Sequence, residues 1–147
     1  MEEGEAQRLF EKGLHAFAQG NTLSALSFFE RAVQLEETPL YCSYYAYCVA
    51  RERGQFQLAV TLCEKAKAKE PDRAIHYLNL GKVYLLAGKK PQAIDVFREG
   101  MRYEENQDIV KELSKIGPRK PPAIPFLRRE NPINKYLGIV LARLRLR

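Results

Sequence analysis

The chain has 147 residues, 46% of them hydrophobic, and a formal net charge of +6. It contains no apolar run of about 18 residues, and its acidic start, residues 1–5, lacks the features of a secretory signal or a mitochondrial presequence. Cys42, Cys48 and Cys63 form an odd number without CxxC spacing, which disfavours a disulfide framework and favours a reducing, cytoplasmic location.

A repeat of 34 residues runs through most of the chain. A fixed period of this length is typical of stacked helix–turn–helix units. Its small residues allow the two helices of a unit to cross closely. The columns in register are Gly20, Gly54 and Gly88; Ala25, Ala59 and Ala93; Phe29, Cys63 and Phe97; Ala32, Ala66 and Gly100; and Gly13, Tyr47 and Gly81.

Each repeat carries its own start and stop signals. The column of Gly20, Gly54 and Gly88 suits the left-handed backbone conformation that ends a helix. Asn21 is a good cap for the second helix of repeat one, and Pro91 suits the first turn of the second helix of repeat three. Pro39 and Pro71 interrupt the chain between repeats. We therefore expect six helices in three antiparallel pairs.

Repeat two inverts the side-chain sizes of its neighbours. Tyr47 stands in a column of glycines, and Ala50 stands where repeat three has Tyr84. We interpret this as a compensated change of volume in the core rather than as a binding site. Cys63, in a column of phenylalanines, should behave as a small hydrophobe.

A motif in repeat three points to a family. It reads Tyr77-x2-Leu80-Gly81-x2-Tyr84 and is followed by Ala93-x3-Phe97. This pattern resembles the tetratricopeptide repeat, with Tyr77 in the usual tryptophan position. Repeat one departs from it, with Lys12 and Ala16 where the motif prefers leucine and tyrosine. The resemblance covers three repeats (about 6–39, 40–73 and 74–107) and implies an all-α, right-handed α-solenoid that acts as a protein-binding scaffold or adaptor.

Residues 106–116 are predicted to form a capping helix. Ile109, Val110, Leu113 and Ile116 recur at helical spacing, with charged residues between them. The last repeat of a solenoid exposes an apolar face that needs such a polar-backed cover. We therefore assign residues 1–116 to one domain of three repeats plus a capping helix.

The composition changes from residue 117 onward. Residues 117–147 begin as a proline-rich linker, and Asn131-Pro132 then favours the start of a short amphipathic helix. This tail carries eight basic residues and one acid, a charge of +7, which leaves the repeats at −1. The tail could dock on the repeats in cis or by swapping between copies, bind a partner protein, or meet an anionic membrane or a nucleic acid. Its predicted contact residues are Ile124, Phe126, Leu127, Leu137, Leu141 and Leu144.

The family resemblance implies a concave groove lined by the first helix of each repeat. A mostly apolar groove suits an amphipathic helix or an extended hydrophobic segment, although burial between helices would equally explain these residues. A cationic clamp for a terminal carboxylate is disfavoured, because the matching places hold Phe10, Leu14, Tyr45, Ile75 and Asn79. The predicted groove residues are Phe10, Leu14, Phe17, Tyr41, Tyr44, Cys48, Arg51, Ile75, Leu78, Lys82 and Leu85.

Catalytic and metal-binding patterns are weak. His15 and His76 have no partner at metal-ligand or general-base spacing, although folding could bring either one to Cys42 or Cys48. We expect no enzyme activity, cofactor or metal. The preferred function is an adaptor that binds a peptide or helix of a partner protein, its own tail, or a second copy. The alternative is a tether that uses the basic tail on a membrane or, less favoured, a nucleic acid.

Overall fold

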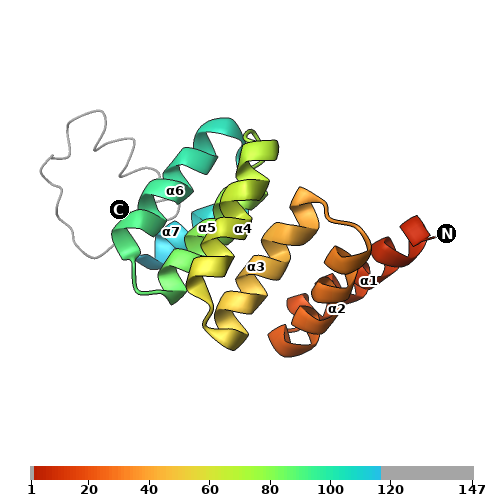
Figure 1. Cartoon of the computed structure of the whole chain (residues 1–147). Coiled ribbons are helices and arrows are strands. Elements are labelled where there is room, and N and C mark those ends of the chain that lie inside the picture. The colour runs from red at the N-terminus through yellow and green to blue at the C-terminus, as the bar shows by residue number, and fades with distance from the viewer. Residues whose placement is uncertain (1, 117–147) are drawn as a thin grey trace, which may run out of the picture. The chain divides into compact units, whose positions relative to one another are not determined.

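The computed structural model describes residues 2–116, and this part of the chain is all α-helical (Figure 1). The predicted six helices of the repeats are confirmed, as is a helix after them. Residues 117–147, with the predicted linker, tail helix and tail contacts, lie outside the described residues. The helices are α1 (Glu2–Ala18), α2 (Thr22–Leu35), α3 (Pro39–Arg53), α4 (Phe56–Lys69), α5 (Ala74–Leu86), α6 (Lys90–Tyr103) and α7 (Gln107–Ile116).

Helices α1 to α6 form three successive hairpins, as an α-solenoid requires. Helix α1 packs on α2, α3 on α4, and α5 on α6. Between hairpins, α2 packs on α3, α4 packs on α5, and α3 also lies beside α5. Each hairpin therefore buries its apolar face against the next one in the chain.

The predicted turn signals are confirmed at the ends of the helices. Gly20, Gly54 and Gly88 adopt φ angles of 80°, 67° and 78°, in the left-handed region that only glycine enters without strain. The side chain of Asn21 accepts a hydrogen bond from the Ser24 N–H at 3.2 Å, capping α2. These local devices explain why the hairpins recur at a fixed interval.

Glycine and phenylalanine fit together where the helices of a hairpin cross. A Cβ atom on Gly13 would lie 2.4 Å from the Phe29 ring, and one on Gly81 would lie 2.2 Å from the Phe97 ring. Both rings are fully buried. The phenylalanine therefore occupies space that only glycine leaves open.

Repeat two has small residues where its two helices cross. Ala46, Ala50, Ala59 and Cys63 share one buried cluster, against which Tyr84 of the next repeat packs. Tyr47 stands at the position of the glycines, and its ring lies 5.6 Å from Phe17 of α1. Our interpretation of Tyr47 as a change of core volume alone was therefore incomplete.

Aromatic rings fill the space between α1 and α3. Phe10 stacks on Tyr41 at 4.6 Å and meets Tyr44 edge-on at 5.5 Å. Phe17 meets Tyr44 and Tyr47 edge-on, each at 5.6 Å. Aromatic pairs at these separations and tilts are favourable beyond the area that they bury. The contact between α1 and α3 is therefore made by aromatic side chains, whereas the backbones of α3 and α5 lie close together.

Helix α7 belongs to a second unit that begins at residue 105. Asn106 caps it, because its side-chain oxygen accepts a hydrogen bond from the Ile109 N–H at 2.9 Å. The helix coincides with the predicted segment, 106–116, to within one residue. Its role as a cap on the third repeat stays a prediction.

We predict that Gly81→Ala destabilises the fold. The added methyl would overlap the Phe97 ring, so we expect a cost toward the upper end of the roughly 1 to 3 kcal/mol typical of overpacking, which exceeds the roughly 1 kcal/mol that alanine gains over glycine in a helix. Urea unfolding followed by circular dichroism measures the difference. Gly4→Ala is the matched control, because its Cβ would lie at an ordinary 3.5 Å from Arg8. Equal or greater stability of Gly81→Ala would contradict the packing argument.

Candidate functional site

The structure divides the predicted groove residues by burial. Phe10, Tyr41, Cys48 and Leu78 are buried, with at most 9% of their surface exposed. Phe10 and Tyr41 are covered because their rings stack on each other. These four side chains pack between helices and, contrary to their prediction as groove residues, offer almost no surface to a partner.

The other predicted groove residues remain accessible. They come from the first helix of each hairpin, and we call them the first-helix surface. All are half-buried except Arg51, which is exposed. The first-helix surface consists of Leu14, Phe17, Tyr44, Arg51, Ile75, Lys82 and Leu85.

One lysine of this surface lies over two aromatic rings. The Lys82 ammonium of α5 lies 5.0 Å from the Phe17 ring of α1 and 4.3 Å from the Tyr47 ring of α3. Cations at such distances are attracted by the negative face of the ring. The arrangement joins three helices from three repeats at one point. Sequence reasoning missed Tyr47 here, although a tyrosine in a glycine column was a signal that its ring had to lie elsewhere.

The cysteine on this face is not a nucleophile at neutral pH. Burial raises the pKa of Cys48 to about 12, although Lys82 acts in the opposite sense. Burial also raises the pKa of Cys42 and Cys63. All three thiols are unpaired and buried. Since the thiolate is the reactive form, none of them is poised for covalent chemistry.

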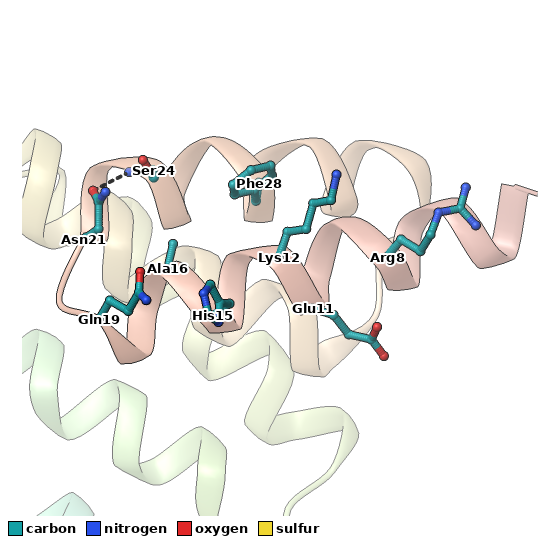
Figure 2. Close-up of a pocket in the computed structure, with 9 residues that line it drawn as sticks. All are labelled: Arg8, Glu11, Lys12, His15, Ala16, Gln19, Asn21, Ser24 and Phe28. Carbon is teal, nitrogen blue, oxygen red and sulfur yellow. Dashed lines mark hydrogen bonds between the residues drawn. The ribbon is translucent and has the colours of Figure 1, made fainter.

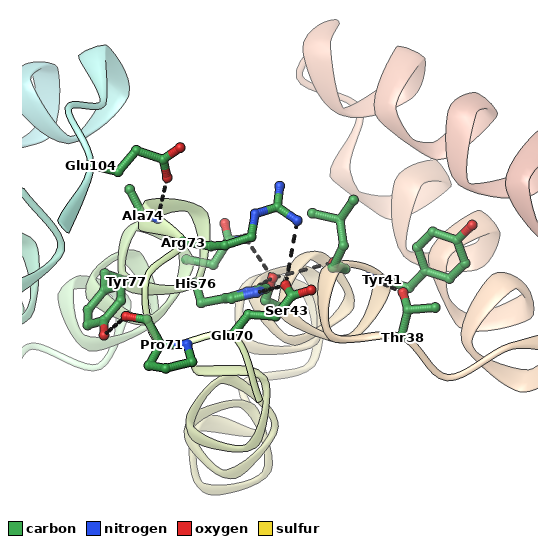
Figure 3. A network of polar contacts seen from close by, with 12 residues as sticks. Thr38, Tyr41, Ser43, Glu70, Pro71, Arg73, Ala74, His76, Tyr77 and Glu104 are labelled. Atoms are coloured by element: carbon green, nitrogen blue, oxygen red, sulfur yellow. Dashed lines mark hydrogen bonds and ion pairs between the residues drawn. The ribbon is translucent and has the colours of Figure 1, made fainter. Parts of the chain in front are cut away.

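A buried polar network lies at the junction of repeats two and three (Figure 3). His76 of α5 contacts the Ser43 hydroxyl of α3 through Nδ1 at 3.0 Å and the Glu70 carboxylate through Nε2 at 2.7 Å. A carboxylate only accepts hydrogen bonds, so neutral His76 donates from Nε2 and accepts the Ser43 proton at Nδ1. The Asn79 amide in turn donates to Ser43 at 3.3 Å. The network links α3, α5 and the C-terminal cap of α4.

This network has the residue order of a hydrolase triad, but its hydroxyl and imidazole are buried. Ser43 and His76 expose none of their surface, so a substrate cannot reach the hydroxyl in this structure. His76 has serine and glutamate as partners rather than the cysteine that we had considered. Sequence reasoning missed these partners because Ser43 lies 33 residues away in the chain and Glu70 lies on the preceding turn.

A hollow of about 480 Å³ opens on repeat one, and we call it the end hollow (Figure 2). Its walls come from α1 and from the N-terminal half of α2. The sequence analysis did not single it out. Its lining includes Arg8, Glu11, Lys12, His15, Ala16 and Phe28.

The part of the chain that the structure describes contains neither a membrane-spanning helix nor a cluster of metal ligands. No helix between residues 2 and 116 has the length and apolarity needed to cross a membrane. Over the same residues, no three His, Cys, Asp or Glu side chains come together as a metal site.

Comparison with known proteins identifies the repeat. Residues 48–102 match the tetratricopeptide repeat family. Among solved structures, the first such domain of Spaghetti (RPAP3), bound to the HSP90 peptide SRMEEVD, is 23% identical, with a TM-score of 0.61 over 77% of this chain and 93% of that one. The Sgt2 domain from Aspergillus fumigatus is 21% identical, with a TM-score of 0.60 over 81% of this chain and 86% of that one. Both likenesses concern the fold.

We predict that His76 makes stability depend on pH. Burial lowers the pKa of His76 below its ordinary 6.5, although Glu70 acts in the opposite sense. In the pH range between the lowered pKa of the folded state and the ordinary 6.5 of the unfolded state, the unfolded chain binds more protons than the folded one. The free energy of unfolding therefore decreases as the pH falls below about 6.5. Urea unfolding between pH 7.5 and pH 5.5 should show a steeper loss for the natural chain than for His76→Gln. His15→Gln, an exposed control, should keep the steep loss. Parallel curves for the natural chain and His76→Gln would contradict this assignment.

We also predict that the thiols are protected until the chain unfolds. A thiol reagent such as Ellman's reagent should react slowly with the folded protein and rapidly with all three cysteines in denaturant, because each one is buried. The measurement is the number of thiols modified against time. Rapid reaction of a cysteine in the folded protein would show that its helix opens.

Proposed function

We propose that this chain, whose residues 48–102 match the tetratricopeptide repeat family, is a non-catalytic adaptor that binds a segment of a partner protein on the first-helix surface. The observation that carries this proposal is the meeting of Phe17, Tyr44 and Lys82, from three different helices, at one half-buried place. Half-buried aromatic side chains offer apolar contact area at a low cost in conformational entropy.

The chemistry of this surface supports a peptide with an apolar anchor and a nearby carboxylate. Leu14, Phe17, Tyr44 and Leu85 supply apolar area, while Lys82 and Arg51 supply positive charge. Phe17 and Tyr47 lie against the Lys82 ammonium, which supports a defined position for that charge. The anchor would then provide affinity, and the carboxylate would set the direction in which the segment binds.

The similar RPAP3 domain is bound to a peptide of a partner protein, which supports a peptide as ligand here. The mode of binding would differ from a cationic clamp, because the matching places in this chain are not basic. Among them, Phe10 and Asn79 are buried, and the Tyr45 hydroxyl donates a hydrogen bond to Glu30 at 3.4 Å. Apolar side chains of the ligand would therefore contribute more to affinity than a terminal carboxylate.

Two further observations support a non-catalytic, cytoplasmic role. The Ser43 hydroxyl and the His76 imidazole are buried out of reach of a substrate, and burial raises the pKa of all three cysteine thiols. Unpaired, buried cysteines are also compatible with a reducing compartment.

We predict that ligands selected from a peptide display library against the purified chain depend on Phe17 and Lys82. The substitutions Phe17→Ala and Lys82→Glu should each weaken their binding by about tenfold or more. The first removes apolar contact with the anchor of the ligand, and the second removes the positive charge that faces its carboxylate. Isothermal titration calorimetry measures the dissociation constant. Leu23→Ala is the control, because Leu23 is 65% exposed on α2. Circular dichroism confirms that each variant is folded.

The proposal fails if selected peptides bind both variants as tightly as the natural chain. Loss of binding only in Leu23→Ala would place the ligand elsewhere on the repeats.

A further inference from the structure

The end hollow lies on the flank of repeat one that is turned away from repeat two. On α2, Thr22 contacts Glu52 of α3, and Glu30 contacts Tyr45 of α3. The hollow uses other positions of α2, among them Ser24 and Phe28. It is therefore a separate place from the first-helix surface and from the junction with α3.

The same flank seats a helix in both of the other repeats. Lys12 corresponds to Ala46 and Leu80, one and two periods later, and His15 corresponds to Val49 and Val83. These four counterparts are fully buried, whereas Lys12 and His15 are exposed. Helix α2 packs on α3, and α4 packs on α5, where the counterparts lie. The shape of this flank therefore suits a packed helix.

The chemistry of the flank differs in repeat one. Arg8 and Lys12 bring two positive charges, and neither forms an ion pair with an acid among residues 4–116. Figure 2 shows the Lys12 side chain extending toward α2, to one side of Phe28, whereas the Glu11 side chain points away from α2. Glu11 accepts a hydrogen bond from Gln7 at 3.2 Å. Ala16 and Phe28 leave an apolar strip in the lining.

From shape and charge together, we propose that the end hollow is a docking seat for an acidic amphipathic helix of a partner protein. Carboxylates of that helix pair with Arg8 and Lys12, while its apolar side chains cover Ala16 and Phe28. The chain's own tail, residues 117–147, has the wrong charge for this role, since it carries +7. The adaptor would thus hold two partners at once, one on the first-helix surface and one on the end of repeat one.

The test is a titration of the full ¹⁵N-labelled chain with a synthetic 16-residue helical peptide. Leucines at positions i, i+3, i+4 and i+7 form its apolar stripe, and glutamates occupy its other face. Backbone shifts should change at Arg8, Lys12, His15 and Ser24. The double variant Arg8→Glu with Lys12→Glu should weaken binding by about tenfold or more, since it replaces attraction by repulsion. Arg98→Glu, exposed on α6, should change it less than twofold.

A peptide of the same pattern with lysine in place of glutamate should not bind. The inference is overturned if the acidic peptide causes no shifts around the hollow, if it shifts only residues such as Phe17 and Tyr44, or if the double variant binds it unchanged. Binding at the first-helix surface alone would leave the proposed adaptor function intact, so the two proposals fail separately.

Discussion

The close crossing of the two helices in a hairpin is the constraint on which the fold depends. Where Phe29 or Phe97 fills the crossing, the facing position must be glycine, because a Cβ at Gly13 or Gly81 would overlap the ring. The pair acts as one unit: the ring fills the volume, and the glycine permits the helices to approach. This crossing sets the distance between the helices of the outer repeats, and neighbouring hairpins stack on the result.

Repeat two departs from this rule, and its departure shapes the candidate binding surface. Repeat two has Cys63 where the other repeats have phenylalanine, and small side chains pack at its helix crossing. The large side chain of this repeat is Tyr47, at the position where the other repeats have glycine. Tyr47 then joins Phe17 and meets Lys82 of the following repeat. A change that balances volume inside one hairpin therefore produces the aromatic and cationic group that joins all three.

Equivalent flanks of the three repeats have different chemistry, and this difference matters more than their common fold. Helix α3 meets repeat one through aromatic rings, and α5 meets repeat two through the buried network of Ser43, His76 and Glu70. The flank of α1 carries charged side chains where the others are apolar. A polar outer face is what an uncovered flank of a solenoid needs, and in our proposal the same polarity selects the ligand. Function in such a protein depends on these surfaces rather than on the solenoid.

The sequence by itself determined the three repeats and the helix limits, because glycine turns, caps and prolines act within a few residues and their 34-residue period is visible along the chain. It also indicated which helix face to examine. Only the tertiary structure decided which residues of that face are accessible: Phe10 and Phe17 are seven residues apart on one helix, yet Tyr41 covers the first and leaves the second half-buried. The partners of His76 and the end hollow were likewise invisible in the sequence. Burial and long-range pairing depend on neighbours brought together by the packing of whole helices, and local spacing carries no record of them.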